Sequence, residues 1–171
     1  MNIAEDPFSM PEGLLKELYP RPYLPEVRRY SQAYGIQEEM VYALMRQESM
    51  FKEIAISRSG AQGLMQIMPA TGRELARGLQ IHGANLMDPE TSIQMGAKFF
   101  SDLMRSYSGD FRWSAIAYNG GPGNLARWKF SFYRGDFNAF LESLPATEPR
   151  DYCRVTYQNY QHYRTLYLLH P

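Results

Sequence analysis

The sequence is poor in the side chains that build disulfide and metal frameworks. Cys153 is the only cysteine among 171 residues, so no disulfide can form within the chain. It lies in an apolar and aromatic pattern, where we expect a buried small hydrophobic side chain. The three histidines, His82, His162 and His170, are scattered, and neither zinc-ligand spacing nor an EF-hand loop pattern occurs. We therefore predict no metal site and no cofactor.

An excess of charge of either sign is also missing. Eighteen basic and eighteen acidic residues give a net charge of zero, whereas nucleic-acid binding requires a basic patch or stripe. The basic and aromatic cluster at Arg127–Phe130 is short and is interpreted as one helix face. We predict no nucleic-acid partner.

Long hydrophobic runs are absent as well. No window is long and apolar enough to span a membrane. The first twenty residues contain Glu5, Asp6, Glu12 and Glu17 and no apolar signal-peptide core. No segment with strict apolar–polar alternation reaches strand length, and no internal repeat appears. These absences predict an all-α chain without a transmembrane segment.

Aromatic and apolar residues are plentiful instead. A chain of 171 residues with 44% hydrophobic residues fits one domain with a core of its own. Thirteen Tyr, nine Phe and two Trp suit a carbohydrate groove, although most of them are expected to fill the core. We predict a compact bundle of about seven to nine helices.

The helix signals divide the chain into a lead-in and one domain. Residues 1–24 are expected to be an irregular lead-in with at most a helical turn from Leu14 to Leu18, and 25–171 the domain. Gly35 and Asp88 are expected to end and begin helices as C-cap and N-cap. We expect a loop at 51–63 and helices at 25–34, 37–50, 69–79, 88–107, 110–119, 124–133, 136–144 and 147–168.

Glu48 is the leading candidate for a chemical role. Val41, Leu44 and Met45 lie on one face of the 37–50 helix, and Glu48 continues that face. Burial disfavours the ionised carboxylate, and a Glu with a pKa of roughly 6–7 can donate a proton at neutral pH. The alternative is an ordinary Glu at a helix end that turns toward solvent.

Two later segments connect Glu48 with a known enzyme family. Gly60–Pro69 is rich in glycine and methionine, and Ala117–Gly123 has a Tyr-Asn pair followed by a turn. With Gln47–Ser49 upstream, their order and spacing resemble the three signature segments of the soluble lytic transglycosylase catalytic domain. The resemblance extends from Leu18 to the last helix. It implies a lysozyme-like fold with a glycan-binding groove, acting on peptidoglycan glycan strands.

The resemblance also implies a mechanism with one carboxylate. Glycosidases usually need two, roughly 5–9.5 Å apart. Glu38 and Glu39 are about ten residues before Glu48, roughly 15 Å along the helix, which is too far for a second carboxylate. Glu53 remains a candidate for that role. In the family, one Glu protonates the bond between N-acetylmuramic acid and N-acetylglucosamine, then removes the C6 hydroxyl proton to close a 1,6-anhydro ring. Such an enzyme works in the periplasm or cell envelope, and its export signal and an upstream helical domain would belong to a longer precursor.

Six further positions match substrate-binding residues of the family: Ser57, Gln66, Met68, Tyr118, Asn119 and Glu148. Plainer readings stay open for several of them. Ser57 could form a turn, Asn119 could cap a helix, and Glu148 could stabilise a helix N-terminus through the macrodipole. The whole Gly60–Pro69 loop could also be a packing motif.

The sequence departs from the family pattern at some positions. Pro149 and Cys153 replace the usual Thr and Val around Arg150 and Tyr152, and Gly120 stands where Ala is frequent. These changes affect the expected groove shape and leave the acid in place. The competing functions are a goose-type lysozyme-like hydrolase, a glycan-binding module without turnover, and a helical interaction module that contacts no sugar.

Overall fold

The computed structural model describes residues 12–168, which form nine helices and only isolated β-bridges. Part of the predicted lead-in, residues 1–11, lies outside the described residues, as do 169–171. The helices are α1 Glu12–Leu18, α2 Leu24–Tyr34, α3 Glu38–Ser49, α4 Pro69–Leu79, α5 Pro89–Ser106, α6 Phe111–Gly120, α7 Pro122–Phe132, α8 Phe137–Ser143 and α9 Thr147–Leu168. The all-α class and the helix number are confirmed. Each helix in 12–168 is too short or too polar to cross a bilayer.

Local capping chemistry explains the helix boundaries that were predicted correctly. Gly35 follows α2 with a left-handed φ of 67°, which costs glycine little, and its N–H bonds to the carbonyls of the last turn. Asp88 precedes α5, and its carboxylate accepts a 2.9 Å hydrogen bond from the Thr91 N–H. The carboxylates of Asp110 and Asp136 cap α6 and α8 in the same way.

Two boundaries differ from the prediction. Residues 12–18 form a full helix, α1, where at most one turn was expected. Helix α7 begins at Pro122 rather than Asn124, because only Gly121, with φ 83°, separates it from α6. Proline fits the first helical position, which has no intrahelical N–H bond to lose.

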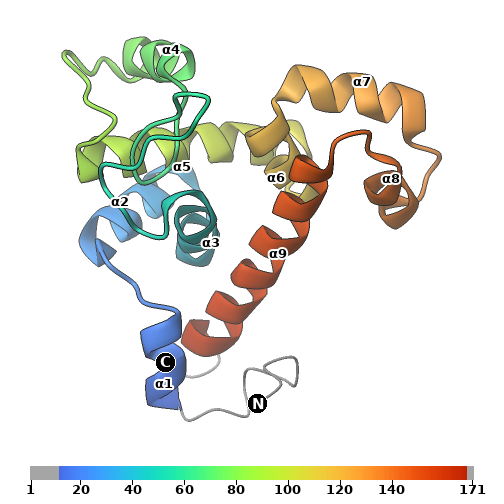
Figure 1. Ribbon diagram of the computed structural model, residues 1–171. Helices are drawn as coiled ribbons and strands as arrows, with labels where there is room; N and C mark the ends of the chain where they lie inside the picture. Colours follow the sequence, from blue (N-terminus) through green and yellow to red (C-terminus); the bar gives the residue numbers. More distant parts are fainter. Residues whose placement is uncertain (1–11, 169–171) are drawn as a thin grey trace.

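Helix α9 packs against several earlier helices of the chain. It runs diagonally in Figure 1 and packs against both α3 and α6, with its C-terminal end beside α1. The Tyr163 hydroxyl donates to the Pro20 carbonyl at 2.9 Å, and the Tyr167 hydroxyl donates to the Tyr19 carbonyl at 2.7 Å. These bonds fasten the segment between α1 and α2 to the core.

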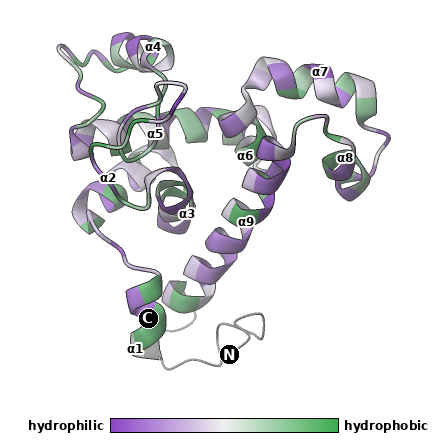
Figure 2. Cartoon of the chain, in the orientation of Figure 1, coloured by the Kyte–Doolittle hydropathy of each residue, from purple (hydrophilic) through white to green (hydrophobic). Residues whose placement is uncertain are grey.

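Hydropathy alone understates how much of α9 is buried. Much of this helix is coloured as hydrophilic in Figure 2, yet Tyr152, Tyr160 and Tyr163 are all buried. A tyrosine buries a large ring and satisfies its hydroxyl with a hydrogen bond. Cys153 is also buried in this helix, as predicted, and burial raises the pKa of its thiol to about 12.

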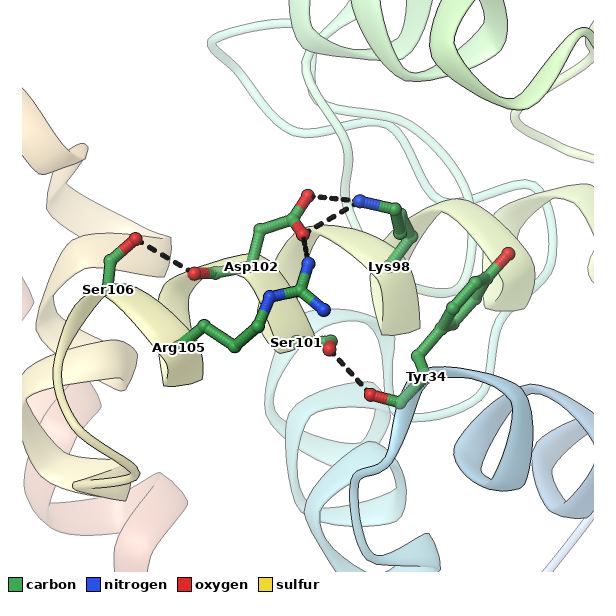
Figure 3. A network of polar contacts seen from close by, with 6 residues as sticks. All are labelled: Tyr34, Lys98, Ser101, Asp102, Arg105 and Ser106. Carbon is green, nitrogen blue, oxygen red and sulfur yellow. Dashed lines mark hydrogen bonds and ion pairs between the residues drawn. The ribbon is translucent and has the colours of Figure 1, made fainter.

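Helices α2 and α5 also pack against each other. The Ser101 hydroxyl donates to the Tyr34 carbonyl at 2.7 Å, which satisfies a carbonyl at the end of α2 (Figure 3). On the outer side of α5, Asp102 pairs with Lys98 at 2.6 Å and with Arg105. The hydrogen bond between Ser101 and Tyr34 thus joins α5 to the C-terminal end of α2.

Candidate active site

Glu48 lies next to last in α3, and its side chain is half-buried. Val41, Leu44 and Met45 on the same helix are fully buried, so the predicted apolar face is confirmed. The helix therefore carries the carboxylate along the side that packs into the core. The Glu48 side chain is not an ordinary one turned to solvent.

The Glu48 carboxylate has one direct partner and one acidic neighbour. Burial raises the pKa of Glu48 to about 7, the Tyr152 hydrogen bond opposes that shift, and the negative charge of Glu148 adds to it. The Tyr152 hydroxyl donates to Oε1 of Glu48 at 2.6 Å across 104 positions of sequence. A carboxyl with this pKa is divided between its acid and base forms at neutral pH.

Two buried tyrosines support this carboxyl. Burial raises the pKa of Tyr118 and of Tyr152 well above the ordinary value, and the charge of Glu48 acts in the same direction on both. Both hydroxyls therefore keep their protons. Tyr118 donates its proton to the Met65 carbonyl at 2.7 Å, which ties α6 to the loop that follows α3.

Two residues with left-handed backbone follow the end of α3. Met50 and Phe51 have left-handed backbone, with φ of 49° and 64°, which side-chain-bearing residues seldom adopt. The Ser49 hydroxyl donates to the Leu64 carbonyl at 2.9 Å and brings the glycine-rich loop back to the end of α3. Such strained backbone persists where the surrounding contacts fix it, which is common at functional sites.

Ser57 and Gln66 both stabilise that loop. The Ser57 hydroxyl accepts a 3.0 Å hydrogen bond from the Ala61 N–H, so the turn-forming role is present. Gln66 has a left-handed φ of 46°, and its amide nitrogen donates to the Ala55 carbonyl at 3.0 Å and the Gly63 carbonyl at 2.8 Å. The amide oxygen of Gln66 has no hydrogen bond to another described residue.

The other predicted positions lie around the same region. Met68, two residues after Gln66, is 41% exposed. Glu148 is exposed in the first turn of α9, and its charge reaches Glu48. Asn119 is within the last turn of α6, next to Tyr118, and is not the cap. Gly121 takes the cap position because its φ of 83° suits glycine.

Two glycines allow close packing around the site. A Cβ at Gly96 of α5 would lie 2.5 Å from Cβ and Cγ of Met65, whose carbonyl accepts the Tyr118 hydrogen bond. A Cβ at Gly120 would lie 2.9 Å from the Trp128 ring. The indole of α7 therefore occupies the space that the usual alanine would need.

Sequence reasoning missed Tyr152 as a site residue. The only sequence signal for Tyr152 was that Arg150 and Tyr152 agree with the family pattern. Glu48 and Tyr152 are far apart in sequence, so their contact could not be predicted from spacing. Glu53, the open candidate for a second carboxylate, is exposed and accepts a 2.6 Å hydrogen bond from Tyr23. Among the described residues, no group of three or more His, Cys, Asp or Glu side chains could hold a metal.

This chain is similar to known proteins in sequence and in structure. The family model described as the Transglycosylase SLT domain matches residues 26–141. The soluble lytic murein transglycosylase of Escherichia coli is 35% identical over 156 residues, which cover 87% of this chain and 24% of that protein. The membrane-bound lytic murein transglycosylase C of Pectobacterium atrosepticum is 39% identical over 117 residues, covering 61% of this chain and 33% of the relative.

Solved structures give the same result. The 70 kDa soluble lytic transglycosylase in complex with bulgecin A aligns with a TM-score of 0.83 and 33% identity, covering 92% of this chain and 26% of that one. An inactive Glu-to-Gln mutant of lytic transglycosylase Slt from Pseudomonas aeruginosa gives 0.80 and 29%, covering 89% and 25%. The likeness confirms the lysozyme-like fold, and this chain spans about a quarter of the length of these relatives. The chain belongs to the transglycosylase SLT domain family.

Proposed function

We propose that this chain is the catalytic domain of a peptidoglycan lytic transglycosylase in which Glu48 is the acid and then the base. The observation that carries the proposal is the half-buried Glu48 carboxyl, with a pKa raised to about 7 and a hydrogen bond from Tyr152. Because one group must give a proton and then take one, a pKa near the working pH serves both steps.

In the first step, Glu48 donates its proton to the oxygen between N-acetylmuramic acid and N-acetylglucosamine as the C1–O bond breaks. The acetamido group of the muramic acid stabilises the positive charge at C1. Tyr152 holds the Glu48 carboxyl in place, and its own proton stays on because burial raises its pKa.

In the second step, the Glu48 carboxylate removes the proton from the C6 hydroxyl of the same muramic acid. The C6 oxygen bonds to C1 and closes the 1,6-anhydro ring, and Glu48 regains its starting proton. No water is consumed. An attached nucleophile gains the effective-molarity advantage of an intramolecular reaction, so a second carboxylate is not needed to position water.

The substrate-binding proposal covers Ser57, Gln66, Met68, Tyr118, Asn119 and Glu148. Gln66 presents a free amide oxygen that can accept a sugar hydrogen bond, and exposed Met68 offers an apolar surface. Tyr118 uses its proton on Met65, so it can only accept from a sugar. We propose that these residues line an open groove that the glycan itself covers.

The longer relatives suggest the setting of this domain. We propose that the chain is part of a longer protein that acts on peptidoglycan in the periplasm or cell envelope, with an upstream helical domain. The basis is that the soluble lytic murein transglycosylase of Escherichia coli, of which this chain covers 24%, is about four times as long as the aligned part.

The mass of the products tests the reaction. Purified sacculi are digested with the protein, and the released muropeptides are weighed by mass spectrometry. We expect anhydro ends, which are lighter than reducing ends by one water. Reducing ends alone would reject the transglycosylase and favour the hydrolase.

The Glu48→Gln variant tests the assigned residue. Gln keeps an acceptor for Tyr152 but cannot donate an acidic proton, so cleavage should disappear while binding to sacculi persists. Unchanged cleavage would reject Glu48 as the acid. Absence of binding by the wild-type protein would favour the interaction module.

A further inference from the structure

A basic cavity borders the loop that carries Gln66 and Met68. It measures about 490 Å³ and lies between α4 and the segment 81–86. Its lining includes the apolar residues Ala76, Ile81 and Leu86 and the polar residues Arg73, Arg77, Gln62 and Asn85. No acidic side chain lines it.

The two arginines lie on the same side of α4. They are four residues apart, a spacing at which like charges repel. The Arg77 Nε donates to the Arg73 carbonyl at 3.4 Å, which directs the Arg77 side chain back toward Arg73. Within residues 12–168, neither guanidinium forms an ion pair with an acidic side chain, whereas Arg28, Arg29 and Arg154 all do.

The cavity adjoins the loop segment that carries Gln66 and Met68. Gln62 in its wall forms hydrogen bonds of 3.0 Å in both directions with Ile67, which lies between Gln66 and Met68. Pro69, the residue after Met68, also lines the cavity. In Figure 1, α4 lies above this loop at the edge of the molecule. A ligand held beside Met68 can therefore extend into the cavity.

We propose that Arg73 and Arg77 form a subsite for the carboxylates of the acidic peptide stem carried by the muramic acid. Two unpaired guanidinium groups suit carboxylates, which accept charge-assisted hydrogen bonds in a planar geometry. The Gln62 and Asn85 amides can bond the peptide backbone, and the apolar lining suits alanine-sized side chains. This inference names part of the substrate of the proposed transglycosylase and rests on that function for its role in turnover.

Binding is tested without turnover. The acidic stem peptide, released from peptidoglycan by an amidase, is titrated into the wild type and into the Arg73→Gln, Arg77→Gln double variant. We expect binding to the wild type and a loss of about tenfold or more in the double variant, since two exposed charge-assisted contacts are removed. The α7 control, Arg127→Gln with Arg134→Gln, removes the same charge from α7 and from a position two residues after its end, and should bind like the wild type because neither residue lines any of the five cavities.

Three results would overturn the subsite: no binding by the wild type, equal binding by wild type and double variant, or an equal loss in the α7 control. Inorganic phosphate is added as a competitor. Weak competition supports a carboxylate site, and displacement of the peptide at equal concentration would overturn the carboxylate assignment. Matching thermal melts of the variants show that folding is unchanged.

Cleavage gives the second readout. The double variant should lower kcat/KM about tenfold on glycan strands that carry stems and leave it unchanged on strands stripped of them. An equal loss on both substrates would contradict a peptide subsite. If the wild type cleaves neither substrate, the proposed function fails, while the peptide titration still decides whether the subsite exists.

Discussion

At the scale of single residues, the environment of Glu48 contains opposing influences that can be changed one at a time. Burial is the largest and favours the neutral carboxyl, and the charge of Glu148 adds to it. The Tyr152 hydrogen bond favours the ionised form. The hydrogen bond and the neighbouring charge come from different residues, so each can be removed by its own substitution.

The Tyr152→Phe variant removes the hydrogen bond and keeps the buried ring. The pKa of Glu48 should rise, because the ionised form loses its donor. The alkaline limb of the kcat/KM profile against pH should therefore move to higher pH, with a lower maximal rate from the less well-placed carboxyl. A profile that moves to lower pH would contradict this role for Tyr152.

The Glu148→Gln variant should act in the opposite direction. It removes a neighbouring negative charge that disfavours ionisation of Glu48, so the pKa of Glu48 should fall. The alkaline limb should move to lower pH. The same profile recorded for Glu142→Gln, an exposed acid that instead pairs with Arg154, is the control and should match the wild type.

Glu48 also links stability to pH. Its carboxyl binds a proton more tightly when folded than when unfolded, so wild-type stability falls as pH rises from about 4.5 to about 7 and stays reduced above that. Gln at this position does not titrate. Glu48→Gln should be more stable than the wild type by about 1–3 kcal/mol at pH 8 and nearly equal to it at pH 4. Urea unfolding at both pH values measures this, and an equal difference at both would contradict the burial of a charge.

At the scale of helices and loops, the boundaries set by local chemistry could be predicted from sequence. Asp88, Asp110 and Gly35 act through neighbours within a few residues, so their roles are visible in the sequence. The partnership of Tyr152 with Glu48 depends on how α9 crosses α3, which no local pattern encodes. The position of Glu48 on an apolar helix face was predictable, and the donor that holds its carboxyl was not.

The contact between α5 and the loop gives a prediction with a matched control. Gly96→Ala should lower stability by about 1–2 kcal/mol, because the clash with Met65 outweighs a better helix propensity. Gly78→Ala in α4 meets nothing within 4 Å and should raise stability by about 0.5–1 kcal/mol. Denaturant unfolding of both variants tests the contact, and stabilisation by Gly96→Ala would show that α5 and Met65 are not in close contact.

At the scale of the whole molecule, the family match and the folding unit have different extents. The match covers residues 26–141, whereas α9 lies beyond it and packs against α3 and α6. Helix α9 also supplies Tyr152 and fastens the segment before α2 through Tyr163 and Tyr167. The residues that hold Glu48 in place therefore extend beyond the matched region.

Removal of residues 147–171 should abolish cooperative folding. The loss would expose the apolar faces of α3 and α6 and leave Glu48 without its donor. We expect weak near-ultraviolet circular dichroism and no sharp thermal transition, against a single sharp transition for the full chain. A sharp transition in the shortened chain would show that α9 is not part of the core.

The most direct measurement of the central claim is the titration of Glu48 itself. The chain is labelled with ¹³C at the Glu side-chain carboxyls, the Glu48 signal is assigned by its loss in Glu48→Gln, and its shift is followed by NMR from pH 3 to 9. We predict a midpoint near 7, well above that of the exposed glutamates. A midpoint near 4.5 would mean that Glu48 is ionised at neutral pH and cannot serve as the proton donor.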